Sequence, residues 1–231
     1  MEVRDFAARP QLSDDVARYV RQRIFEGSYG AGEYVRLEQV AAELGISVTP
    51  VREALLTLRA EGLLVQQPRR GFMVVPVAGR DLADVSGVQA FIGGELAARA
   101  ATRITDEQLS GLKAIQAELE DAYTGDDHEG AVRLNHEFHR AINVAADSPK
   151  LAQMMSQITR YAPESVFPTV AGWPAQSNKD HRWVLAALAQ RDPERARTTM
   201  SDHFMAGVAP LIDHLRQHGV VDGATSRRQR R

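Results

Sequence analysis

A short polar connection between two helical patterns restricts the fold of this chain more than any other feature. Residues 37–45 have the pattern of a short helix that ends at Gly45, and residues 51–62 have that of a second helix that ends at Gly62. The residues Ile46-Ser-Val-Thr-Pro50 join them. Two helices joined by so short a turn predict a helix-turn-helix, whose second helix can enter the major groove of DNA by its N-terminus.

Helix-end signals agree with this layout. Glycine tolerates the left-handed backbone that often follows a last helical turn, as expected at Gly45 and Gly62. Thr49 suits the N-cap position and Pro50 the first helical position, where a missing N–H costs nothing. The predicted inward face of the second helix is apolar and consists of Val51, Leu55 and Leu58.

The flanking segments complete a winged domain in residues 1–77. Ser13 is expected to cap a first helix, whose apolar face holds Val16, Val20 and Ile24. Residues 63–66 and 72–75 have strand patterns and flank the segment QPRRG, which predicts a hairpin with a basic tip.

After this hairpin the chain shows helical patterns and almost no strand signal. The expected helices span residues 81–103, 106–123, 126–146, 149–161, 175–190 and 193–218. We therefore predict a mostly α protein: an N-terminal winged helix-turn-helix in residues 1–77 and a C-terminal all-helical bundle of six or seven helices in residues 78–231.

Composition excludes several classes of site. The chain has no cysteine, so disulfides, thiol nucleophiles and thiolate metal sites are excluded. It contains no run of 18 apolar residues, and its N-terminus lacks the apolar segment of a signal peptide. We expect a cytoplasmic protein with no membrane association.

Charge permits DNA binding without demonstrating it. The formal net charge is −2, but the segment from Ser47 to Gly71 contains four arginines and only two glutamates. Small polar side chains at Ser47 and Thr49 allow close approach to phosphates or base edges, and Arg52 is long enough to fork onto a guanine. The wing residues Arg69, Arg70 and Gly71 would lie against the adjacent groove. The alternative is a small helical domain with solvated arginines.

The segment YVRLEQVAAELGISVTPVREAL, followed by EGLL and RGF, closely resembles the GntR regulator superfamily over residues 11–75. The resemblance implies DNA-contacting positions at Arg36, Ser47, Thr49, Pro50, Arg52, Arg70 and Gly71. One residue departs from the pattern, because Val48 stands where the family usually has arginine. A phosphate or base contact is then lost, and the valine can instead touch a thymine methyl group.

All seven histidines lie at position 128 or later. Asn135 and His139 are four residues apart on one helix and share a face. With His181 and His203 from two other helices they could converge inside a bundle and bind a first-row metal ion. The alternative is that each histidine is merely packed or solvated.

The segments NHEFHRAI and DHRWVLAAL, with Asp202 and His203, resemble the FCD ligand-binding domain of FadR-type GntR regulators over residues 80–218. The resemblance implies that Asn135, His139, His181 and His203 bind a divalent ion, Zn or Ni, that helps hold a carboxylate effector. Asn135 replaces the usual Asp, so the metal site is one charge more positive and affinity is expected to fall.

The first helix of this domain also departs from the family pattern. Gln89 stands where an arginine is common, and Gly93 where a glutamate is common. Arg99 or Arg160 could replace the missing arginine in effector binding. Gly93 and Gly94 in mid-helix cost roughly 1 kcal/mol each relative to alanine, which close helix packing or room for a ligand would explain.

We therefore expect a ligand-responsive repressor that is not an enzyme. It would bind double-stranded operator DNA as a homodimer, on palindromic half-sites about one helical turn apart, and respond to a small-molecule effector. The rival is a metal-dependent helical enzyme that acts on a small organic acid, because His136-Glu-Phe-His139 is one residue short of a zinc-hydrolase motif. A third alternative is a helical protein whose winged domain contacts another protein.

Overall fold

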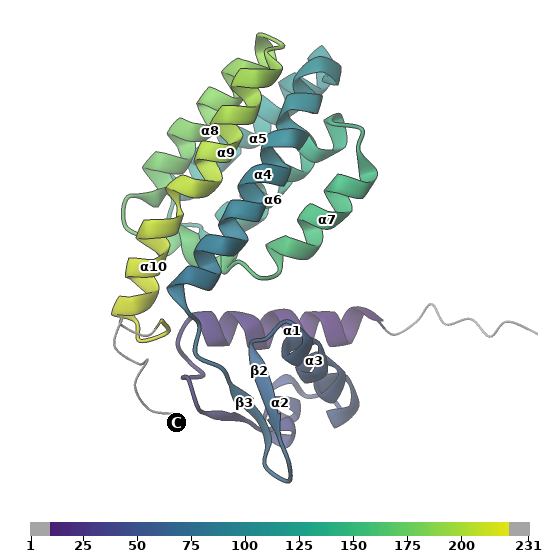
Figure 1. The fold of residues 1–231 in the computed structure, drawn as a ribbon, viewed down its shortest axis with the longest axis vertical. Helices are drawn as coiled ribbons and strands as arrows, with labels where there is room; N and C mark the ends of the chain where they lie inside the picture. The colour runs from purple at the N-terminus through teal and green to yellow at the C-terminus, as the bar shows by residue number, and fades with distance from the viewer. Residues whose placement is uncertain (1–9, 222–231) are drawn as a thin grey trace, which may run out of the picture. The chain divides into compact units, whose positions relative to one another are not determined.

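The computed structural model describes residues 10–221, in which a winged helical unit is followed by a bundle of helices (Figure 1). The first part contains α1 (Pro10–Phe25), β1 (Tyr34–Val35), α2 (Leu37–Leu44), α3 (Val48–Ala60), β2 (Leu64–Gln67) and β3 (Gly71–Val74). The strands form one antiparallel sheet in the order β1-β3-β2. The predicted hairpin is present, whereas β1 lies in a segment to which the sequence patterns assigned no strand.

The core of this unit forms between α1 and α3. Val16, Val20 and Ile24 of α1 are buried, as are Val51, Leu55 and Leu58 of α3. These are the two apolar faces that periodicity predicted. The helix α1 begins at Pro10, so Ser13 lies within its first turn and is not its N-cap.

The second part contains seven α-helices and one 3-10 helix within the described residues. They are α4 (Gly79–Arg103), α5 (Asp106–Thr124), α6 (His128–Ala145), α7 (Pro149–Thr159), η1 (Glu164–Thr169), α8 (Trp173–Ala189), α9 (Pro193–Ala206) and α10 (Val208–Gln217). The helix α4 packs against α9, α6, α7 and α8, while α5 packs against α6 and α8. In Figure 1, α4 and α9 run side by side.

Two glycines explain how closely α4 and α9 pack. A Cβ atom at Gly94 would overlap Ser201 and lie 3.0 Å from the carbonyl oxygen of Arg197, and a Cβ at Gly93 would overlap the ring of Phe204. Close helix packing therefore accounts for these two mid-helix glycines.

The last predicted helix, residues 193–218, is divided at Gly207. A Cβ atom there would lie 2.9 Å from ring atoms of Phe167 and of Trp173. These two rings press on the backbone where α9 ends and α10 begins, which a pattern of apolar residues could not reveal.

The described residues form two compact units, residues 10–78 with 215–221 and residues 79–214. Residues 215–221 thus belong to the winged unit, whereas the sequence placed them in the helical half. Within that unit Val221 forms a parallel bridge with Val77, and Val220 and Val221 are buried. No helix in residues 10–221 has both the length and the apolar character that a membrane span needs.

Candidate functional site

The predicted recognition helix presents an open N-terminus. It begins at Val48 with Ser47 as an extended N-cap residue, so the expected N-cap at Thr49 was two residues too late. Pro50 is still accommodated, because the first helical N–H groups have no partner within the helix. Ser47, Val48 and Thr49 are exposed, and the Ser47 side chain makes no capping hydrogen bond.

The side chains of four exposed arginines in this unit make no ion pair or hydrogen bond within residues 10–221: Arg36, Arg52, Arg69 and Arg70. They are among the nine predicted DNA-binding residues, of which only Pro50 and Gly71 are partly covered. Guanidinium groups without protein partners are available for phosphate oxygens or base edges.

Two other arginines hold α3 in place. Arg21 of α1 donates to Glu61 at the end of α3, with Nη2 2.7 Å from Oε1 and Nε 3.1 Å from Oε2. Their side chains are 13% and 7% exposed, so this is a buried, two-pronged ion pair. Arg59 Nη1 donates to Gln66 Oε1 of β2 at 2.6 Å. Sequence reasoning treated Arg59 and Glu61 only as charges and missed this positioning role.

The wing turns through an unusual backbone. The Arg70 N–H donates to the Gln67 carbonyl oxygen at 3.1 Å, which closes the turn through Pro68 and Arg69. Arg69 has a φ of 62° and Gly71 a φ of 96°. The left-handed conformation costs a non-glycine residue about 1–2 kcal/mol, but glycine little. Backbone geometry therefore explains Gly71, and Arg69 is a strained residue at an exposed tip.

A groove of about 560 Å³ lies between the wing and the start of α2. Its lining includes Arg36, Arg69 and Arg70 and only one acidic residue, Glu38. The fold thus joins Arg36 to the wing arginines, 33 residues later, in one concave basic surface suited to an anionic backbone.

The helical unit brings three of the predicted metal ligands together. His139 of α6, His181 of α8 and His203 of α9 each offer a nitrogen within 4.8 Å of the others. His181 and His203 are buried, and their Nε2 atoms lie 3.3 Å apart. The ring of Phe138 stacks on His181 with a centroid separation of 4.0 Å and holds it in place.

Gln116 determines which nitrogen of His181 carries the proton. The Gln116 amide nitrogen donates to Glu120 Oε1 and to Asn178 Oδ1, both at 3.1 Å, so its oxygen faces His181. That oxygen lies 2.7 Å from His181 Nδ1 and can only accept, so Nδ1 carries the hydrogen. In the neutral ring, Nε2 therefore presents a lone pair toward His203.

Asp180 lies behind His203 but does not hydrogen-bond to it. Its Oδ2 atom is buried without a hydrogen bond and lies 3.5 Å from His203 Nδ1. A proton on that Nδ1 suits the carboxylate and leaves a second lone pair on His203 Nε2, which faces the lone pair of His181. Two such lone pairs at 3.3 Å repel each other unless a cation or a proton lies between them.

Burial keeps two of these rings neutral. It holds the pKa of His139 well below the ordinary value, and the nearby His203 and His136 lower that pKa further. Burial likewise lowers the pKa of His181, with smaller contributions from His203 and His139. Both rings are therefore in the neutral form that binds metal ions at neutral pH.

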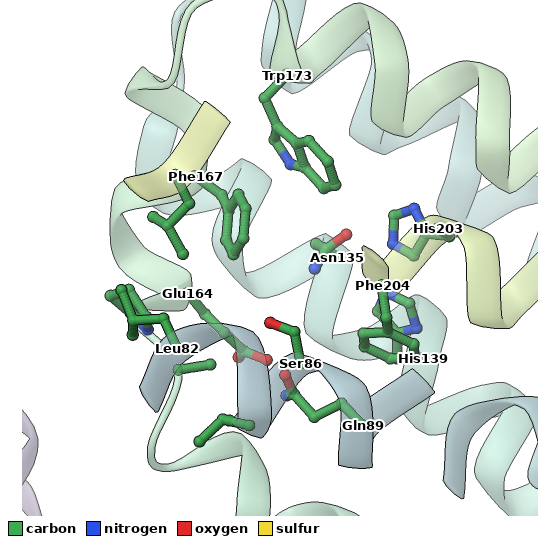
Figure 2. A pocket seen from close by; sticks show the side chains of 14 residues that line it. Leu82, Ser86, Gln89, Asn135, His139, Glu164, Phe167, Trp173, His203 and Phe204 are labelled. Carbon is green, nitrogen blue, oxygen red and sulfur yellow. The ribbon is translucent and has the colours of Figure 1, made fainter. Parts of the chain in front are cut away.

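Asn135 lines the same cavity, of about 40 Å³, as His139 and His203 (Figure 2). Its Oδ1 atom is buried and has no hydrogen-bond partner within the described residues. A buried acceptor without a partner is costly, so this oxygen is available to a ligand. All four predicted metal-binding residues thus meet at or beside one cavity.

The predicted effector residues divide into two groups. Gln89 is 4% exposed and lines the histidine cavity. Arg99 is exposed and donates to Ser148 Oγ at 2.9 Å, and Arg160 is exposed at the end of α7. Neither arginine lines this cavity. Arg99 lies ten residues beyond Gln89 on α4, about 15 Å along the helix. No lysine or arginine is among its lining residues.

The shortened zinc-hydrolase pattern has no counterpart in this site. His136 lies outside the histidine cluster and pairs with Glu164, its Nδ1 atom 3.7 Å from Oε2. This contact raises the pKa of His136. His136 and His139 therefore face different partners.

Comparison with known families agrees with both halves of the molecule. Residues 12–74 match the model of bacterial regulatory proteins of the gntR family. Residues 84–206, more than half of the chain, match the FCD domain.

Individual relatives extend over most of the chain. The HTH-type transcriptional regulator McbR of Escherichia coli K12 is 27% identical over 204 residues, covering 87% of this chain and 92% of McbR. A Paenarthrobacter nicotinovorans protein named "Probable D-xylose utilization operon transcriptional repressor" is 28% identical over 220 residues and 94% of each chain.

Solved structures also resemble this chain over most of its length. A structure of E. coli McbR/YncC matches with a TM-score of 0.72 and 26% identity over 88% of this chain and 98% of that one. Lar, which controls the agr system of Listeria monocytogenes, shares the fold with a TM-score of 0.58 and 21% identity, covering 86% of this chain and 95% of its own.

Proposed function

The chain belongs to the GntR family of bacterial regulatory proteins and carries an FCD domain, and from this premise we propose that it is a homodimeric, effector-controlled repressor. Members of this family are ligand-responsive, DNA-binding transcription regulators and not enzymes, so the enzyme alternative is set aside. The DNA-contacting residues, the dimer surface and the contents of the sensor are inferred from the exposure, charge and burial of particular side chains.

The exposed start of α3, with partnerless arginines around it, is the observation that carries the DNA-binding assignment. Ser47, Thr49 and the helix N-terminus suit phosphate contacts, and Arg52 suits a base edge. Val48, 39% exposed, offers an apolar surface for a thymine methyl group. The wing would bring Arg69 and Arg70 to the neighbouring backbone.

Titration of the protein against a fragment of its own promoter tests this assignment. The affinity should fall steeply as salt rises, because bound arginines release counterions from DNA. An affinity that does not change with salt, or is equal for an unrelated fragment at moderate salt, would favour the alternative in which the winged unit contacts protein.

An apolar surface on α4 supports a homodimer. Phe91 is 71% exposed and Val88 46%, and residues three apart on a helix are neighbours. Exposed aromatic and aliphatic groups of this kind are typical of association surfaces. A two-fold dimer would present two α3 helices to the two halves of a palindromic operator.

A divalent ion, Zn or Ni, would be held by His139, His181, His203 and Asn135. Four observations support this: the facing Nε2 atoms of His181 and His203, the burial that keeps His139 and His181 neutral, the partnerless Asn135 oxygen, and the hydrogen bond to Gln116 that orients His181. In a tetrahedral site with bonds of about 2.0–2.1 Å, two nitrogens are about 3.3–3.4 Å apart, which matches the separation of His181 and His203. The bound ion would supply a Lewis acid for an oxygen of the effector.

The effector of the histidine cavity would be a small metabolite, such as a carboxylate held by that ion. Because the cavity has no lysine or arginine and contains Glu164, a carboxylate there depends on the ion for its counter-charge. Gln89 would add a neutral hydrogen bond. The similar protein from Paenarthrobacter nicotinovorans is named a probable repressor. We infer that effector binding weakens operator binding here, and that DNA weakens effector binding by the same factor.

A further inference from the structure

A second, larger cavity shares a wall with the histidine cavity. It has a volume of about 340 Å³ and lies between α6 and α7; we call it the outer cavity. Cavities of this order accept small organic ligands, whereas the histidine cavity, of about 40 Å³, has room for an ion and a group as small as a carboxylate. His139, Glu164 and Phe204 line both spaces and so form the wall between them.

Gly93 allows this wall to exist. A side chain at position 93 would overlap the ring of Phe204 and come within 3.1 Å of the Met155 methyl group. Without one, the ring lies across the space, with its centroid 5.2 Å from that of His139 and 5.6 Å from that of His203. The wall between the outer cavity and the histidine cavity therefore consists of the Phe204 ring, the His139 imidazole and the Glu164 side chain.

The outer cavity has one positive charge without a partner. Arg140 lines it and is exposed, and its side chain makes no hydrogen bond or ion pair within residues 10–221. The one carboxylate in the lining, Glu164, is already 3.7 Å from the imidazole of His136. A guanidinium group at the mouth of a cavity favours an anion and can hold a carboxylate with two hydrogen bonds.

Apolar side chains cover the deeper part of the outer cavity. Met155 and Met200 are 5% and 2% exposed, and both line it together with Phe204. Methionine adapts to irregular apolar shapes. A single arginine balances one carboxylate, whereas a phosphate carries a charge of about −1.5 to −2 and would need a further cation. Charge and shape thus select an amphipathic molecule with one negative charge.

We propose that the outer cavity binds a small organic monocarboxylate, whose carboxylate pairs with Arg140 and whose apolar body packs against Met155, Met200 and Phe204. Of the ion-binding histidines this site shares only His139, and it needs no metal. The proposal rests on the proposed function in one respect, that the bound acid acts as an effector. Because the acid would touch Phe204 and His139, its binding would act directly on the wall of the histidine cavity.

Calorimetry on the full chain, stripped of metal with a chelator, tests the site. The probes are straight-chain carboxylates from butanoate to octanoate and the matching neutral amides. We expect at least one acid to bind and its amide to bind about tenfold more weakly or worse. Arg140→Gln should weaken the acid by a similar factor. Arg133→Gln should not, because Arg133 lies on the same helix but pairs with Glu137 instead.

The proposal is overturned if no acid of the series binds, if the amide binds as well as the acid, or if Arg140→Gln and Arg133→Gln behave alike. Operator binding with and without the acid is measured separately. If an acid binds through Arg140 but leaves DNA affinity unchanged, the outer cavity is a binding site but the acid is not an effector. A protein that binds the acid but no operator contradicts the proposed DNA-binding function.

Discussion

The Nε2 atom of His181 lies 3.3 Å from the Nε2 atom of His203 in a site where both rings are buried. Gln116 holds the His181 proton on the opposite nitrogen, so the facing atom has a lone pair. Such a pair is unfavourable in an apolar interior unless a cation lies between the two atoms. What lies between the two rings should therefore govern both metal binding and stability.

Metal binding should depend on Gln116. Gln116→Leu removes the acceptor that orients His181, and loss of such a partner lowers metal affinity about 10- to 100-fold. Ni²⁺ binding can be followed by quenching of Trp173, whose ring centroid lies 5.5 Å from that of His203, in a Trp183→Phe background. The exposed Gln157→Leu is the matched control. Equal Ni²⁺ affinity in both variants, or full metal content in His139→Ala/His181→Ala, would contradict the site.

The metal-free protein should lose stability as the pH falls below about 6.5. Burial lowers the pKa of His139 and His181 in the folded state, so below the unfolded value of about 6.5 the unfolded chain binds more protons. For each of these histidines the free energy of unfolding then falls by up to about 1.4 kcal/mol per pH unit, until the pH reaches the pKa of that histidine in the folded state. Urea unfolding between pH 7.5 and 5.5 measures this loss.

Titration of His136 changes the stability in the opposite direction, so His136 is replaced in that experiment. Its pKa is raised by Glu164, so its stabilisation is present at low pH and is lost as the pH rises through the folded pKa. The measurement is therefore made in a His136→Gln background. A free energy of unfolding that stays constant from pH 7.5 to 5.5 would mean that the two buried rings are not held neutral.

Arg52 should contribute directly to operator affinity. Arg52→Ala is expected to cost about 1–3 kcal/mol if the side chain reads a base, and to relax specificity at one position of each half-site. Arg18→Ala removes the same charge from an exposed position on α1 and should change affinity much less. Fluorescence anisotropy with operator and scrambled duplexes measures both. An equal loss of affinity for the operator and the scrambled duplex would mean that Arg52 contacts a phosphate and not a base.

The buried pair of Arg21 and Glu61 should be essential to the winged unit. Arg21→Leu leaves Glu61 charged and without its partner, which typically costs about 3–5 kcal/mol. The double variant Arg21→Leu/Glu61→Leu should recover most of this loss, because no unpaired charge remains buried. Denaturant unfolding of the single and double variants tests the coupling. Additive losses would show that the pair is only a surface contact.

Phe91 should lie in the dimer interface. Phe91→Asp places a charge on the exposed apolar face of α4 and should shift the protein to the monomer at micromolar concentration. Met154→Asp, 45% exposed on α7, is the control and should remain dimeric. Light scattering after size-exclusion chromatography gives the mass. If the Phe91→Asp protein remained dimeric, the dimer interface would lie on a different surface.

Local sequence signals were sufficient for most of the elements. The apolar periods at Val16, Val20 and Ile24 and at Val51, Leu55 and Leu58 identified the core of the winged unit, because burial of one helix face leaves a 3.6-residue period in the sequence. Helix ends were less exact, and the N-cap of α3 was misplaced by two residues because Ser47 and Thr49 are both good capping residues.

The chain's sequence by itself determined the order of helices and strands and which residue types could meet, including Asn135, His139, His181 and His203. Only the tertiary structure decided that Gln116 orients His181, that Gly207 divides the last helix, and that Arg140 lines the outer cavity while Arg99 lies away from the histidine cavity. The physical reason is that periodicity records burial along one element, whereas these contacts join residues from different elements. Their distances arise only when the helices pack.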